Sequence, residues 1–400
     1  MTFHGSRLRT RLRGATGYAT VAILASVSCG WSQESHRLES PDGKNVVVVD
    51  VEDGRLVYSF DRENRKLILP SGLGFELREA PLLGSEVRIS DVSRNSVDES
   101  WEQPWGEVRY VRDHHNELRV SAEEVDGLRR SFDVVFRAFD DGIAFRYELP
   151  EQANLGEFEI TDELTEFHFA EDPKAWWIPA NDPTHRYELL YRHSPLSTMP
   201  EVHTPLTLVT LEGLHLVIHE ANLVDYAGMN LTASMDRRLS VTLPAWADGV
   251  KVRGRTPFVT PWRTIQVAEN AADLQPSLLG LNLNPPSAIE DVSWIDPMKY
   301  IGIWWSLHIN LETWGSGPDH GATTENTRRY IDFAADNGFG GVLVEGWNLG
   351  WDGNWIENAE LFSFTEPYPD FDLEALAAHA QERGVTLIGH NETSMGVENY

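Results

Sequence analysis

The sequence predicts a multidomain protein, with an N-terminal β-sandwich followed by an α/β region of parallel strands and helices. Three observations support this prediction. A length of 400 residues suits two domains better than one. Residues 36–275 read as many short strands separated by Gly and Asp turns, without long helical periodicity. From about residue 299 onward, short apolar runs alternate with helix-like stretches, which is typical of parallel β/α units.

The β-rich region begins with a predicted hairpin. Residues 45–51 and 55–60 are strand-like, and Glu52, Asp53 and Gly54 supply the turn between them. Further strands are predicted over 118–122, 130–139, 143–149, 206–210, 214–219 and 239–243. These elements assign residues 34–285 to a β-sandwich domain.

Prolines at 285, 286 and 297 mark a linker over residues 286–298. Beyond it, strands are predicted over 300–305, 341–344 and 385–388. The first intervening helix is expected to begin at Thr323 or Thr324 and to end at Gly338, and the second to begin at Asp370 or Asp372 and to end at Gly384.

We expect residues 299–400 to form the first three β/α units of an incomplete (β/α)8 TIM barrel. A closed barrel needs eight such units and about 250 residues. The sequence is therefore expected to be a truncated form of a longer protein.

Residues 1–33 have the pattern of a secretory signal peptide. Arginines at 7, 9, 11 and 13 form a basic start, 19–27 is a short apolar run, and small residues follow. The run is too short for a permanent membrane span, and no other segment is apolar for eighteen residues. We expect a secreted, periplasmic protein. Cys29, the only cysteine, is an alternative lipid attachment site, although Ser26 stands where such sites usually carry an aliphatic residue.

The net charge of −29 argues against nucleic acid or an anionic membrane surface as a partner. The chain also contains 14 Trp. Tryptophan rings stack on the apolar faces of sugars, but they also fill large cores. The composition is therefore compatible with a carbohydrate ligand without requiring one.

Two glutamates follow predicted parallel strands in the C-terminal region. Glu345 follows the run 342–344, and Glu392 follows 385–388, with His390 two residues before it on the same side of the chain. The carboxyl ends of barrel strands are where barrel enzymes hold their reactive groups, and cleavage of a glycosidic bond needs two carboxylates. The alternative is structural: Glu345 caps the loop at Gly346 and Trp347, and Glu392 forms a salt bridge.

Glu220 follows an apolar strand in the sandwich region. A carboxylate beside a turn can bind a hard cation such as Ca²⁺, which takes six to eight oxygen ligands. A lone glutamate is weak evidence for such a site. The sequence contains no dense Asp/Asn calcium loop and no His/Cys cluster with zinc spacing.

Several motifs together resemble glycoside hydrolase family 97, the α-glucosidases and α-galactosidases of bacterial glycan use. The resemblance runs from about Leu38 to Tyr400. The motifs are Ser40-Pro41-Asp42-Gly43, the run 139–147, Glu220-Ala221-Asn222-Leu223, the run 260–265, Val344-Glu345-Gly346-Trp347-Asn348 and His390-Asn391-Glu392-Thr393-Ser394. The resemblance implies an N-terminal β-super-sandwich, a (β/α)8 barrel and a small C-terminal β-domain.

The resemblance also implies roles for individual residues. Glu220 corresponds to a calcium ligand that the sandwich donates to the barrel pocket. Glu345 and His390 correspond to substrate-binding residues, and Trp347 beside Glu345 is included with them. Glu392 corresponds to a general base that acts on water in inverting members of the family. The general acid and the other calcium ligands lie downstream in the family.

The function implied is that of an exo-acting, calcium-dependent, inverting α-glucosidase acting on oligosaccharides. The chain of 400 residues is itself expected to be inactive, because it lacks the acid. A retaining α-galactosidase of the same family is the first alternative. A non-catalytic glycan-binding protein, using the sandwich and its tryptophans, is an alternative of a different class.

Overall fold

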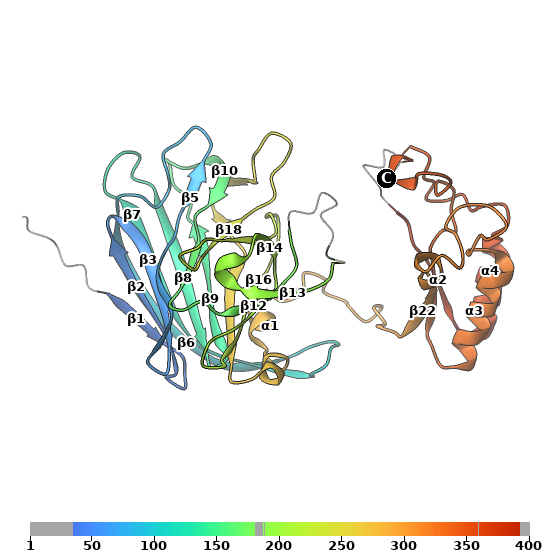
Figure 1. Ribbon diagram of the computed structural model, residues 1–400, viewed down its shortest axis with the longest axis horizontal. Helices are drawn as coiled ribbons and strands as arrows, with labels where there is room; N and C mark the ends of the chain where they lie inside the picture. Colours follow the sequence, from blue (N-terminus) through green and yellow to red (C-terminus); the bar gives the residue numbers. More distant parts are fainter. Residues whose placement is uncertain (1–34, 181–186, 188, 359, 393–400) are drawn as a thin grey trace, which may run out of the picture. The chain divides into compact units, whose positions relative to one another are not determined.

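The computed structural model describes residues 35–180, 187, 189–358 and 360–392. The predicted signal peptide, including Cys29, lies outside these residues. The chain divides into two compact units, one formed chiefly by residues up to Pro286 and the other chiefly by residues from Ser287 onward. Figure 1 colours the first unit from blue to yellow and the second in orange and red.

The first unit contains two large antiparallel sheets in its described residues. One has the order β1-β2-β3-β4-β11-β18-β17-β14. Its strands are β1 (His36–Glu39), β2 (Asn45–Glu52), β3 (Arg55–Arg62), β4 (Arg65–Gly72), β11 (Glu166–Phe169), β18 (Arg238–Thr242), β17 (Asn230–Ala233) and β14 (Glu201–His203). The predicted hairpin is β2–β3, and Asp53 and Gly54 in its turn both take positive φ, 48° and 76°. Such a two-residue turn matches the twist of the flanking strands.

The other large sheet has the order β13-β12-β15-β16-β21-β9-β8-β7-β6, and β20 also pairs with β9. Its strands are β13 (Arg192–Pro195), β12 (Lys174–Trp177), β15 (Leu206–Val209), β16 (His215–Ala221), β21 (Trp262–Ala268), β9 (Gly142–Leu149), β8 (Ser131–Phe139), β7 (Tyr110–Glu124), β6 (Val87–Glu102) and β20 (Phe258–Val259). A small third sheet, β19-β10-β5, consists of β19 (Val252–Arg255), β10 (Glu157–Glu163) and β5 (Phe75–Leu77). Short helices are η1 (Leu196–Thr198), η2 (Ala271–Leu274) and α1 (Leu279–Asn282).

The two large sheets pack face to face around one apolar core. Tyr58 of β3 lies 4.8 Å from Phe145 of β9 and 5.9 Å from Phe136 of β8, measured between ring centroids, and all three side chains are fully buried. Alternation along β3, with every second residue buried, supplies one inner face. The N-terminal unit is therefore a β-sandwich, as predicted.

The second unit contains a parallel sheet of three strands in the order β22-β23-β24, namely β22 (Tyr300–Ile303), β23 (Gly341–Val344) and β24 (Thr386–Gly389). Helices α3 (Thr324–Asp336) and α4 (Leu373–Arg383) connect them, with α2 (Trp305–His308) and η3 (Trp355–Glu357) as short additions. The Thr323 side chain caps α3 and the Asp372 side chain caps α4, whereas Gly384 ends α4 at φ 68°.

Several observed strands were not among the predicted ones, and two differences have a clear physical reason. The first parallel strand ends at Ile303, whereas the prediction extended it to residue 305. Trp304 and Trp305 are exposed and lie beyond the strand. They continue its apolar run, so the sequence pattern alone does not mark where the strand ends. Strand β6 was not predicted, because its exposed polar residues leave no apolar alternation. Among the described residues, no helix is both long enough and apolar enough to cross a membrane.

Candidate active site at the ends of two parallel strands

The parallel register of β23 and β24 brings two of the candidate residues to one edge of the sheet. Val344 is paired with Gly389, so Glu345 and His390 are the next residues on the two neighbouring strands. The backbone N–H of His390 donates to the carbonyl of Val344 at 3.0 Å, which extends the strand pairing to the site itself. Side chains at this edge face the same space because parallel strands end in the same direction.

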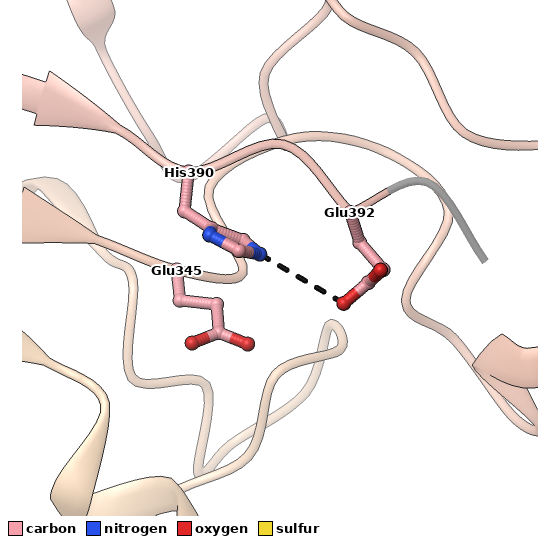
Figure 2. Close-up of side chains that lie close together, drawn as sticks. All are labelled: Glu345, His390 and Glu392. Carbon is pink, nitrogen blue, oxygen red and sulfur yellow. Dashed lines mark ion pairs between the residues drawn. The ribbon is translucent and has the colours of Figure 1, made fainter. Parts of the chain in front are cut away.

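Glu345, His390 and Glu392 form a compact cluster, which Figure 2 shows in close-up. One ligand atom from each of the three side chains lies within 4.8 Å of the others. His390 Nε2 and Glu392 Oε2 are 3.8 Å apart, which is too long for a hydrogen bond but close enough for an ion pair when the imidazole is protonated. The structure thus brings together three of the five residues singled out from the sequence.

Glu345 is a buried carboxyl group with one strong donor. Its exposed fraction is 8%, and the indole Nε1 of Trp314 donates to its Oε1 at 3.0 Å. Burial raises the pKa of Glu345 above its usual value, and the Trp314 hydrogen bond and the imidazoles of His390 and His308 oppose that rise. Glu345 can therefore exchange a proton more readily near neutral pH than an exposed glutamate can.

His390 carries an unsatisfied polar atom. Its Nε2 is buried and has no hydrogen-bond partner among the described residues. An unpaired buried nitrogen is costly, so such an atom usually has a ligand or water as its partner. Its position beside two carboxylates marks the centre of the cluster as a place for a polar ligand.

Trp347 lies differently from the other predicted substrate-binding residues. Its ring is only 6% exposed and packs near Phe371, and its indole N–H donates to the carbonyl of His390 at 2.8 Å. This contact fixes the backbone of His390 at the end of β24. The described structure gives Trp347 a role in holding the site, and its contact with substrate stays a prediction.

An aromatic group that the sequence analysis did not single out adjoins the cluster. His308 lies edge-on to Trp314 at 5.1 Å and to Trp304 at 4.5 Å, and Trp314 stacks on Trp351 at 6.3 Å. Aromatic rings beside carboxylates are the usual components of a sugar site, because they bind the apolar C–H faces. The available signal was Trp304-Trp305 at the end of the predicted strand 300–305, followed by His308.

Glu220 lies in the sandwich unit, at the end of β16. Its Oε2 accepts a hydrogen bond from Arg263 Nη1 at 2.6 Å, and its Oε1 accepts one from the backbone N–H of Met229 at 3.0 Å. Arg263 is fully buried and also binds Glu163 through two hydrogen bonds, of 2.9 and 2.6 Å. Sequence reasoning missed this network, although an arginine within the apolar run 262–267 needs a buried acid as partner.

The charges of Glu220, Arg263 and Glu163 determine whether Glu220 can act as a ligand to a calcium ion. Burial alone would raise the pKa of Glu163, but Arg263 and the hydroxyls of Thr165 and Tyr226 lower it, so Glu163 is ionised. One arginine and two glutamates leave one net negative charge, and each oxygen of Glu220 keeps a free lone pair. Glu220 therefore fits the role of a carboxylate ligand to a hard cation.

Comparisons with known proteins match most of the chain. Residues 38–286 match the family described as glycosyl-hydrolase 97 N-terminal, and residues 304–400 match the family described as glycoside hydrolase 97. A curated relative, a retaining alpha-galactosidase from Bacteroides thetaiotaomicron, is 27% identical over 94% of the chain. A probable retaining alpha-galactosidase from Streptomyces bingchenggensis is 26% identical over 85% of the chain.

Some solved structures are more similar than these relatives. A glycoside hydrolase family 97 enzyme from Pseudoalteromonas sp. is 47% identical over 91% of the chain, with a TM-score of 0.88. The same enzyme has been solved in complex with acarbose and with panose, at 48% identity and a TM-score of 0.87. The chain spans 55% of the length of those chains, and 59% and 49% of the two curated relatives.

Proposed function

Because the chain belongs to glycoside hydrolase family 97, we propose that the full-length protein is an exo-acting α-glycosidase that hydrolyses terminal α-glucosyl residues of oligosaccharides. The observation that carries this proposal is the cluster of Glu345, His390 and Glu392 at the carboxyl ends of two parallel strands (Figure 2). A carboxylate that can take a proton from water, with polar groups beside it that can bind sugar hydroxyls, is part of what sugar hydrolysis requires. Both family matches in one chain support the same assignment.

Each residue of the cluster has a distinct role in this proposal. Glu392 acts as the general base that removes a proton from the attacking water. Glu345, buried and held by Trp314, accepts hydrogen bonds from sugar hydroxyls, and the free Nε2 of His390 contacts a further hydroxyl. Trp347 positions His390 through its carbonyl.

The two glutamates are not themselves the acid and base of an inverting reaction. An inverting pair is separated by about 6.5–9.5 Å to admit water, whereas oxygens of Glu345 and Glu392 lie within 4.8 Å of each other. We propose that the acid lies on a further strand of a (β/α)8 barrel that begins with the three described strands.

The comparisons are compatible with specificity for either glucose or galactose. The more similar structural relative has been solved with acarbose and with panose, an oligosaccharide of α-linked glucose, which favours α-glucosidase activity. The curated relatives are called retaining alpha-galactosidases, which favours the alternative, but they are only 26–27% identical. We therefore place α-glucosidase activity first and retaining α-galactosidase activity second.

Calcium is part of the proposal through Glu220. The ion would be held by the Glu220 carboxylate, which leaves the network one net negative charge because Glu163 already neutralises Arg263. Bound calcium would stabilise the ionised form of nearby carboxylates. We further propose that residues 1–33 direct the protein to the periplasm.

Hydrolysis of aryl glycosides tests the proposed function. The full-length protein should release p-nitrophenol faster from p-nitrophenyl α-glucoside than from the α-galactoside, and proton NMR should show the β-anomer of glucose forming first. Faster galactoside cleavage with the α-anomer formed first would favour the retaining alternative. Oligosaccharide binding without any hydrolysis would favour a non-catalytic glycan-binding protein.

A further inference from the structure

A second candidate site lies in the sandwich unit, where the loop after β18 meets the loop after β16. The hollow there has a volume of about 500 Å³ and is lined by Trp246, Tyr226, Asp225, Lys251 and Arg253, with Pro244 and Ala245 as small apolar members. A neighbouring hollow of about 700 Å³ shares Asp225 and Arg253 with it. We call the two hollows together the sandwich groove.

Trp246 is an exposed aromatic side chain on a fixed backbone. It is 66% exposed, yet its N–H donates to the carbonyl of Val250 and its carbonyl accepts from the N–H of Gly249, both at 2.8 Å. Gly249 takes φ 83° and closes this turn. The ring is therefore presented to solvent from a rigid turn, which lowers the entropy lost when a ligand stacks on it.

Aromatic rings continue from Trp246 into the second hollow. Tyr226 lies 6.2 Å from Phe258, and Phe258 lies edge-on to Phe158 at 5.3 Å. A Cβ at Gly254 would collide with the Phe158 ring, so only glycine lets that ring cover β19. Phe158 is buried, and Tyr226 and Phe258 are partly exposed, so the groove offers the exposed ring of Trp246 with two partly exposed rings beyond it. This arrangement suits a ligand of more than one unit.

The polar groups of the groove are held in place by ion pairs. Lys251 Nζ lies 2.6 Å from Asp162, and Arg253 pairs with Glu159 at 3.2 Å and with Asp248. These cations are neutralised by their partners, and Asp225 is exposed, so the groove has no surplus positive charge for an anionic ligand. An exposed aromatic face combined with fixed donors and acceptors, and with no surplus positive charge, suits an uncharged, hydroxyl-rich molecule better than an anion.

We propose that the sandwich groove is a second binding site, for a neutral oligosaccharide of several sugar units, and that it takes no part in bond cleavage. The identity of the ligand class rests on the proposed glycosidase function, whereas the existence of the groove does not. Trp246 provides the stacking face, and Asp225, Lys251 and Arg253 provide hydrogen bonds along the rim. Such a site would hold a long glycan on the protein while its terminal sugars are removed.

Calorimetric titration with maltoheptaose, and with stachyose as a galactosyl probe, tests this proposal in the full-length protein. Both titrations are made in the Glu392→Gln background to limit turnover. Trp246→Ala should weaken one class of oligosaccharide site about tenfold, and Trp246→Phe should restore most of the affinity. Trp294→Ala is the matched control, because Trp294 is 71% exposed and does not line the groove.

Kinetics with a short substrate separate this site from the reaction site. In an otherwise wild-type protein, Trp246→Ala should leave kcat/KM for p-nitrophenyl α-glucoside unchanged. The proposal would be overturned if Trp246→Ala bound oligosaccharide as tightly as the parent protein, or if Trp294→Ala lost as much affinity as Trp246→Ala. A fall in kcat/KM for the short substrate that matched the loss of oligosaccharide affinity in Trp246→Ala would also overturn it. Failure of the wild-type protein to hydrolyse any aryl glycoside would contradict the proposed function. The binding titration would still show whether the sandwich groove binds oligosaccharide.

Discussion

The indole N–H of Trp314 donates to Glu345 Oε1 at 3.0 Å, linking a loop residue to a strand-end carboxyl group 31 positions later. Burial raises the pKa of Glu345, and this hydrogen bond favours its ionised form. Trp314 also contacts His308 and Trp351, so the donor is held by other rings. The ionisation of Glu345 therefore depends on an aromatic group that lies outside the conspicuous sequence motifs.

Trp314→Phe tests this dependence. The substitution keeps a ring but removes the donor, so the pKa of Glu345 should rise further. If Glu345 binds sugar as a carboxylate, the acidic limb of kcat/KM against pH should move to higher pH. Trp294→Phe, in an exposed position of the linker, should leave the profile unchanged. A lower activity with an unmoved acidic limb would argue against tuning by Trp314.

Glu392→Gln tests the base role. Glutamine keeps the size of the side chain but cannot accept a proton from water, so kcat should fall by about 10²–10⁴-fold. KM and the unfolding temperature should change little, because Glu392 is partly exposed and glutamine keeps its size. Glu382→Gln, on the exposed side of α4, is the control. A kcat within threefold of wild type would remove Glu392 from the base role.

Strong local signals explain which features the sequence predicted. The β2–β3 hairpin follows from its Asp-Gly turn, and α4 follows from the Asp372 cap and the Gly384 stop, each encoded within a few residues. The sequence also predicted that Glu345 and His390 lie close together, because each follows a parallel strand and parallel strands end at the same edge of a sheet. By contrast, the Arg263–Glu163 pair joins residues 100 positions apart, so it depends on sheet packing that no local pattern specifies.

Glu163→Gln tests the buried ion pair. Arg263 would stay buried with half of its compensating charge removed, and breaking a buried pair from one side costs about 3–5 kcal/mol. Chemical denaturation of the sandwich unit, followed by near-ultraviolet circular dichroism, measures the change in the free energy of unfolding. Glu39→Gln, which removes an exposed partner of Arg37, should cost less than about 1 kcal/mol. Equal losses in the two variants would contradict the assignment.

The same pair predicts how stability depends on pH. The pKa of Glu163 is lowered in the folded state, because Arg263 outweighs the effect of burial. Its contribution to stability is therefore fully present above the unfolded value, near 4.5, and is lost as pH falls through the folded pKa. Unfolding free energy measured from pH 6 to pH 3 should fall more steeply in the wild type than in Glu163→Gln. Parallel curves would show that another carboxyl group controls acid unfolding.

Calcium removal tests the role of Glu220. Within the network of Glu220, Arg263 and Glu163, the Glu220 carboxylate keeps lone pairs for a cation, and 8% of its side chain is exposed. Added Ca²⁺ should raise the unfolding temperature of the full-length protein and restore activity after chelation. Glu220→Gln keeps the hydrogen bond from Met229 but removes the charge, so at least tenfold more Ca²⁺ should be needed for half of either effect, a shift of about 1.4 kcal/mol. Glu201→Gln, on β14 of the same unit, should leave the calcium dependence unchanged. If Glu220→Gln and wild type respond to the same calcium concentration, the ion is held by other residues, and the network around Arg263 serves the sandwich alone.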